Sequence, residues 1–88
     1  MESKTVRVEV TMDDIAHGER HSCTQCPIAR ALKRQGHMAD PSVDGLYIQD
    51  DERGMCGRTP SEANQFIQMF DDGCHVEPFA FDLTLERE

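Results

Sequence analysis

The sequence has no apolar run that approaches the roughly 20 residues needed to cross a lipid bilayer. Its first residues, Met1 to Thr5, also lack the basic start and the apolar stretch of a secretion signal. We therefore expect a cytoplasmic protein that has no membrane partner. Cysteines in that compartment are kept reduced, which argues against a disulfide framework built from the four cysteines.

Catalytic signatures are missing as well. The chain contains no Gly-x-Ser-x-Gly elbow, no His-Glu-x-x-His pair and no glycine-rich phosphate loop. The histidines fall in or beside expected loops, and none belongs to a recognisable arrangement of a nucleophile and a base. They are His17, His21, His37 and His75. The sequence therefore predicts a protein that is not an enzyme and that carries no cofactor.

Basic residues are few, with 9 Lys and Arg against 17 Asp and Glu and a net charge of -8. Because phosphates repel carboxylates, we expect no direct binding of nucleic acid. The imbalance is confined to one half: residues 1–39 hold five acids and six bases, and residues 40–88 hold twelve acids and three bases. Such asymmetry is typical of a surface for a partner, or of a solvated face kept for solubility.

The apolar residues that are present follow regular periods, which predicts a single folded domain over residues 1–88. Residues 5–12 alternate, with Val6, Val8, Val10 and Met12 on one face of an expected strand. Residues 79–85 alternate in the same way at the other end of the chain. Because these two strands are the longest and match in pattern, we expect them to be neighbours in the sheet.

Two helices are predicted from capping and apolar spacing. The first spans residues 24–35, with Thr24 as its cap and Gly36 just past its end. The second begins with the capping box of residues 59–62 and ends at Gly73. With a short helical turn over residues 12–18 and short strands at 46–49 and 55–58, the order is β-α-β-β-α-β. This predicts a two-layer α+β domain with two helices on one face of a small, mostly antiparallel sheet.

The cysteines allow three interpretations. A C-x-x-C pair stands at a helix start, so it could belong to a zinc site, act as a redox dithiol, or consist of small buried residues. Only one close pair is present, so we predict no metal site, and the alternative is a zinc site formed by Cys23, Cys26, Cys56 and Cys74.

Cys26 is predicted to be buried, because it falls near the apolar stripe of the first helix. On that basis, replacing it with serine is expected to cost about 1–3 kcal/mol through a buried hydroxyl without a partner.

Acidic residues form the main candidate site. Residues 40–52 contain no base, and Asp71 and Asp72 stand at the end of a helix, where the dipole disfavours each anion by about 0.3–1 kcal/mol. Charges in unfavourable places indicate a use outside the fold. The predicted partner-binding carboxylates are Asp40, Asp44, Asp50, Asp51, Glu52, Asp71, Asp72 and Glu77.

Four segments carry a resemblance: Asp14-Ile-Ala-His-Gly18, Cys23-x-x-Cys26-Pro-Ile-Ala-x-Ala-Leu32, Phe66-Ile-x-x-Phe-Asp-x-Gly73 and Val76-x-Pro-Phe-x-Phe81. Over residues 12–85 the chain resembles a family of small uncharacterised proteins from phages, prophages and other mobile elements. The resemblance implies a small α+β domain with no known activity. In size, charge and context the chain also resembles the anti-CRISPR proteins, several of which imitate nucleic acid.

These features together predict a phage-type inhibitor of a host defence complex, acting as a monomer in the host cell cytoplasm. The expected partner is a basic host protein complex, such as a CRISPR surveillance complex subunit that binds DNA, and the acidic surface would imitate the DNA. The alternative is a small zinc-binding or structural domain of a mobile element with no inhibitory role.

Overall fold

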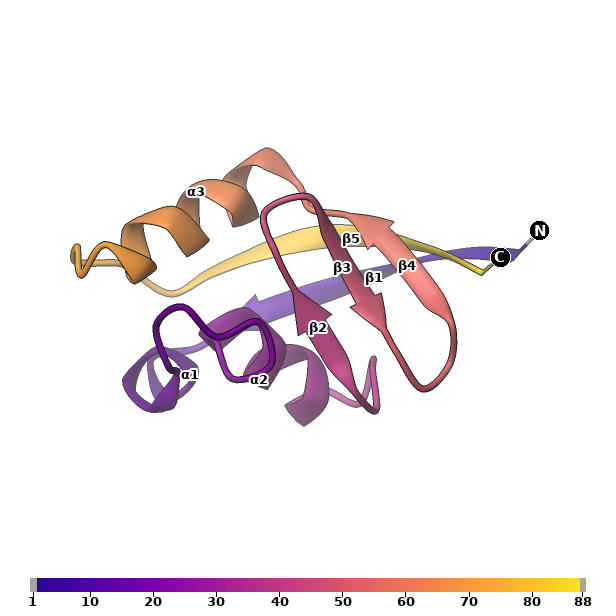
Figure 1. The fold of residues 1–88 in the computed structure, drawn as a ribbon, viewed down its shortest axis with the longest axis horizontal. Coiled ribbons are helices and arrows are strands. Elements are labelled where there is room, and N and C mark those ends of the chain that lie inside the picture. Colours follow the sequence, from indigo (N-terminus) through magenta and orange to yellow (C-terminus); the bar gives the residue numbers. More distant parts are fainter. Residues whose placement is uncertain (1, 88) are drawn as a thin grey trace.

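The computed structural model describes residues 2–87, which form a five-stranded antiparallel sheet and three helices (Figure 1). The first and last elements of the chain are long strands, and all the other elements lie between them in the sequence. The elements are β1 (Glu2–Val10), α1 (Met12–His17), α2 (Pro27–Arg34), β2 (Pro41–Val43), β3 (Tyr47–Asp50), β4 (Met55–Arg58), α3 (Ser61–Asp71) and β5 (Phe79–Arg87). The α+β class is confirmed, but the β-α-β-β-α-β order is wrong by one strand and one helix.

The sheet has the strand order β1-β5-β4-β3-β2. β1 pairs with β5 along its whole length, from Glu2 opposite Arg87 to Val10 opposite Phe79, which confirms that the two long strands are neighbours. β4 joins β5 only where Met55 and Cys56 lie opposite Arg87 and Glu86. The paired residues end there, although Gly57 still packs closely against the backbone of β5, and the short strands cross the long pair at a steep angle (Figure 1). The sheet is therefore curled.

The additional strand is β2, which begins at Pro41. Pro41 lies opposite Asp50 and Val43 lies opposite Ile48 on β3. β2 is the last strand of the sheet, and an edge strand tolerates a proline because it need not donate to a second neighbour. On the open side, the backbone N–H of Val43 donates to the carbonyl of Cys23 at 2.7 Å.

The helix missing from the predicted order is α1, which confirms the short helical turn predicted over residues 12–18. It begins at Met12, a residue also assigned to the expected strand. Thr11 and Asp14 form a capping box, in which each side chain accepts from the other residue's backbone N–H, at 3.2 and 3.0 Å. The box turns the chain out of the strand at Val10. Met12, expected to point into the core, is 58% exposed as the first residue of α1.

Helix α2 begins three residues later than predicted, and its cap is Cys26 instead of Thr24. The Cys26 sulfur accepts from the backbone N–H of Ala29 at 3.5 Å. Pro27 then takes the first helical position, which needs no N–H donor. Cys26 is 3% exposed, so its predicted burial is confirmed.

The capping role changes the expected effect of replacing Cys26 with serine. A serine hydroxyl at this position has a partner, the N–H of Ala29, and serine is a preferred cap. We now expect Cys26→Ser to change the free energy of unfolding by less than about 1 kcal/mol, and Cys26→Ala to cost about 1 kcal/mol more than serine. Urea unfolding of both variants checks the order, and a serine variant less stable than the alanine variant would contradict it.

Helix α3 starts at Ser61, and the predicted capping box does not form. Pro60 occupies the cap position without a side-chain hydrogen bond, while the hydroxyl of Thr59 donates instead to the carbonyl of Asp44 at 2.9 Å. The end of the helix is as predicted: Gly73 has φ +80°, a left-handed conformation that glycine adopts without strain.

One core holds the sheet and the helices together. The inward side chains of the long strands are buried as the alternation predicted, and α2 and α3 bury apolar faces in the same cluster. The ring of Phe66 on α3 stacks on the ring of Phe79 at the start of β5, with centroids 4.6 Å apart. The fully buried side chains include Val8, Ile28, Leu32, Ile48, Phe81, Leu83 and Leu85.

No helix among residues 2–87 is long and apolar enough to span a bilayer.

Candidate functional site

Three exposed carboxylates lie together at one end of the sheet. Asp51 and Glu52 lie in the loop between β3 and β4, and Asp40 lies just before β2. The backbone N–H of Asp51 donates to the carbonyl of Asp40 at 3.2 Å, so these two residues are neighbours in space. We call Asp40, Asp51 and Glu52 the acidic hairpin end.

The charge of the acidic hairpin end is not compensated. Within the described residues, none of its three carboxylates has a hydrogen-bond or ion-pair partner. Arg53, the only base in residues 40–57, lies 3.6 Å from a carboxylate oxygen of Asp50 and donates to the carbonyl of His37 at 3.3 Å. Because Asp50 already neutralises Arg53, the exposed acids keep their full negative charge.

Asp50 was predicted to contact the partner, and the structure corrects this: it is 1% exposed. Its carboxylate accepts hydrogen bonds from backbone N–H groups of two segments, the residues before β2 and the β3–β4 loop. Ala39 donates at 3.2 Å and Glu52 at 3.1 Å. Burial alone would raise the pKa of Asp50, but these backbone hydrogen bonds outweigh it and hold that pKa below its ordinary value. Asp50 therefore shapes the acidic hairpin end from inside.

Asp44 lies apart, in the turn between β2 and β3. One of its carboxylate oxygens accepts from the backbone N–H groups of Leu46 at 2.8 Å and Tyr47 at 2.7 Å. This is the usual way in which an aspartate stabilises a turn. Asp44 is exposed, but the hydrogen bonds give it a local role, and it is not part of the acidic hairpin end.

The predicted acids near the end of α3 lie elsewhere again. Figure 1 places the C-terminal end of α3 toward one end of the long axis and the β3–β4 loop toward the other. Asp71 accepts from the backbone N–H of His21 at 2.9 Å, and Glu77 lies 2.8 Å from the Nε2 atom of His75. Asp72 is exposed. Asp71 and Glu77 therefore have partners within the chain, and the eight predicted carboxylates do not form one surface.

The four cysteines are free and are not gathered into one place. Cys23 and Cys74 are exposed, Cys26 caps α2, and Cys56 lies on β4. Among residues 2–87 there is no group of three or more His, Cys, Asp or Glu that could hold a metal ion. Burial also raises the pKa of Cys26, which is the opposite of what a reactive dithiol needs. Within residues 2–87, therefore, no three of Cys23, Cys26, Cys56 and Cys74 are grouped so that they could share a metal ion.

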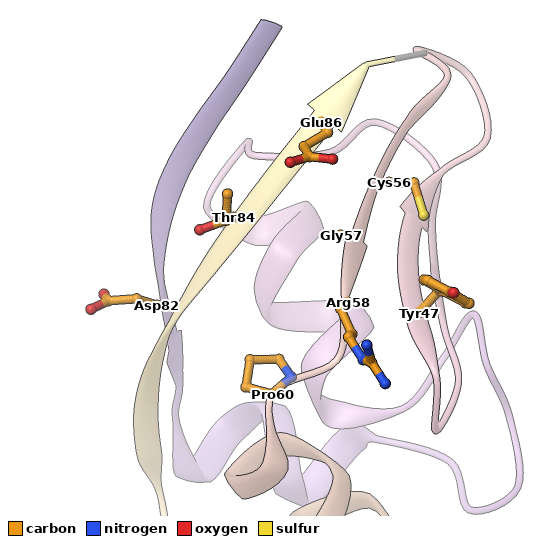
Figure 2. A pocket seen from close by; sticks show the side chains of 8 residues that line it. All are labelled: Tyr47, Cys56, Gly57, Arg58, Pro60, Asp82, Thr84 and Glu86. Atoms are coloured by element: carbon orange, nitrogen blue, oxygen red, sulfur yellow. The ribbon is translucent and has the colours of Figure 1, made fainter. Parts of the chain in front are cut away.

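A groove that the sequence did not reveal runs along the outer face of the sheet, where β4 and β5 diverge (Figure 2). Its volume is about 460 Å³. Arg58 and the half-exposed ring of Tyr47 lie on one side, and Glu86 lies on β5 near the β3–β4 loop. Its lining comes from strands that are distant in sequence, so only the strand pairing could disclose it. Glu86 adds a fourth exposed carboxylate on the side of the acidic hairpin end.

No protein-family model, no curated protein and no solved structure matches this chain.

Proposed function

We propose that this protein is an acidic binding module, not an enzyme, that inhibits a host defence complex by occupying a basic DNA-binding groove. The observation that carries the proposal is the acidic hairpin end, where three neighbouring carboxylates are exposed and have no partner within residues 2–87. Carboxylates of this kind attract the Lys and Arg side chains that otherwise bind phosphates.

The hairpin also supports the proposal by its rigidity. Asp50 accepts from the backbone N–H groups of Asp40 at 3.4 Å and of Glu52 at 3.1 Å, so a buried carboxylate fixes the residues that carry the exposed ones. A surface held in one conformation before binding loses less entropy when the partner arrives. The acidic hairpin end is thus suited to imitate a fixed row of phosphates.

The expected target is a CRISPR surveillance complex, in keeping with the resemblance to phage-borne proteins and to anti-CRISPR proteins in size and charge. The test measures binding of the purified protein to such a complex, together with competition against its DNA target. The variant Asp40→Asn/Asp51→Asn/Glu52→Gln should lose about tenfold or more in affinity, because each lost contact contributes on the order of 0.5–1 kcal/mol. Raised salt should weaken binding of the unaltered protein to the complex, and it should have less effect on binding of the variant.

A matched control removes the same number of charges at other exposed positions. We expect Glu19→Gln/Asp72→Asn/Glu77→Gln to bind nearly as well as the unaltered protein. An equal loss in both triple variants would show that net charge alone matters, and would overturn the assignment to the acidic hairpin end. Binding that leaves the DNA still bound to the complex would rule out imitation of DNA.

A further inference from the structure

A second charged feature lies on the part of the molecule formed by α1 and α2 (Figure 1). A cleft of about 290 Å³ opens between these helices and the residues that lead into α2. Arg30, Lys33 and Arg34 of α2 line it, with Asp13 and Asp14 of α1. Cations are therefore in excess in this cleft, although the chain as a whole has a net charge of -8.

One ion pair in the cleft is internal to the fold. Arg34 donates to both carboxylate oxygens of Asp14, at 3.4 and 3.1 Å, and Asp14 is 2% exposed. Burial alone would raise the pKa of Asp14, but hydrogen bonds from Arg34 and Thr11 outweigh it and hold that pKa below its ordinary value. Asp13 lies 3.3 Å from its own neighbour on α1, the ring of His17. The two carboxylates thus have partners that are not Arg30 or Lys33.

Arg30 and Lys33 have no carboxylate partner among the described residues, in a chain with 17 acids. The Nε atom of Arg30 is buried and has no hydrogen-bond acceptor within residues 2–87. Buried donors without an acceptor are rare in native proteins, so this one needs an explanation. The hydroxyl of Thr24 and the side-chain amide of Gln25 line the same cleft, and neither is hydrogen-bonded to a described residue.

We propose that this cleft binds a phosphate group, either free or as the phosphomonoester of a small molecule. The Arg30 guanidinium offers Nε and Nη donors side by side, which match two phosphate oxygens. Because Nε is buried in the observed conformation, the side chain must rotate for Nε to reach the ligand. Lys33 supplies a second positive charge, and Thr24 and Gln25 supply neutral donors from the opposite wall. The overall acidity of the chain and the nearby Asp13 oppose a long polyanion, so a small ligand fits better than a nucleic-acid strand.

The site is tested by following amide and arginine Nε–H chemical shifts during titration with inorganic phosphate, and with sodium chloride at equal ionic strength. Phosphate should give saturable shifts at Thr24, Gln25, Arg30 and Lys33, and ribose 5-phosphate should shift the same signals. Arg30→Gln and Lys33→Gln should each weaken phosphate binding about tenfold, the effect of losing one charge-assisted contact. Arg58→Gln, which removes an exposed arginine on the other side of the sheet, should leave the affinity for phosphate unchanged.

Shifts that fail to saturate, or that chloride reproduces, would overturn the proposal, as would an equal loss in Arg58→Gln. If Arg30→Gln does not fold, the exposed Lys33 provides the same test through its own variant. If a short single-stranded oligonucleotide displaces phosphate and binds more tightly, the proposal of a small ligand is overturned and the cleft is a nucleic-acid site. The acidic hairpin end takes no part in any of these measurements, so the outcome is independent of the proposed function.

Discussion

Replacing Asp50 with alanine should lower the free energy of unfolding by about 3–5 kcal/mol, because several backbone donors lose a buried charged acceptor and hydrogen bonds to charged groups contribute about 1.5–3 kcal/mol each. The carboxylate accepts from the backbone N–H groups of Ala39, Asp40, Glu52 and Arg53 and lies near the Arg53 guanidinium. Alanine leaves these donors without an acceptor beneath the hairpin loop. Urea unfolding at neutral pH measures the loss, and Asp51→Asn, one residue away and exposed, serves as the control with almost no change.

The contribution of Asp50 should also depend on pH, because its pKa is lowered in the folded protein. A lowered pKa means that the stabilisation is complete above the unfolded pKa of about 3.9 and is lost as the pH falls through the folded pKa. The difference in stability between the unaltered protein and Asp50→Asn should therefore be constant near neutral pH and should narrow at acidic pH. A difference that grows on acidification would contradict the buried, ionised carboxylate.

Replacing Gly57 with alanine should cost about 3 kcal/mol, at the upper end of what overpacking usually costs. A Cβ atom on Gly57 would lie 2.3 Å from the carbonyl oxygen of Thr84 and 3.1 Å from the Cδ1 atom of Leu83. The first contact is with the backbone of β5, which β1 holds along its whole length. β4 would have to move away instead, and its short pairing with β5 at Met55 and Cys56 would be lost.

Gly45 offers a matched comparison for Gly57. Its added Cβ would meet only the side-chain amide of Asn64, at 3.2 Å. Displacing this amide costs at most its hydrogen bond to the Gly45 carbonyl. Gly45→Ala should therefore cost much less than Gly57→Ala. Thermal unfolding compares the two, and amide hydrogen exchange should show faster exchange in β4 for Gly57→Ala alone. Equal stability of the two alanine variants would mean that β4 and β5 are not packed as closely as the structure has them.

Much of the fold could be predicted because its signals are local. Alternation over a long strand fixes which side chains face the core, and it correctly placed Val6, Val8 and Val10 on the inward face of β1. The register, in which Val8 lies opposite Phe81, comes from the structure. Where two local signals compete, only the structure shows which of them prevails. The strand pattern ran on to Met12, but the capping box of Thr11 and Asp14 ends the strand earlier, because two backbone donors gain acceptors there.

The candidate site was only partly predictable. The sequence correctly places Asp51 and Glu52 among exposed acids in a segment, residues 40–52, that contains no base. That the next residue, Arg53, is held by Asp50 is known only from the structure. It could not distinguish Asp50 from its neighbour, since both are acids at the same turn and their difference is one of burial. The carboxylate of Asp50 is inside because backbone donors from two separate segments converge on it, and that convergence exists only after β2 and β3 have paired.

The sequence alone determined the α+β class, the neighbouring long strands, the inward faces of the elements and the burial of Cys26. Each of these follows from the period of side chains along one element, which the backbone geometry imposes locally. The tertiary structure decided which charges are exposed without a partner, where the groove opens, and that the cysteines stay apart. Those properties depend on side chains from distant segments coming within a few ångströms of each other, and one strand placed differently would change them all.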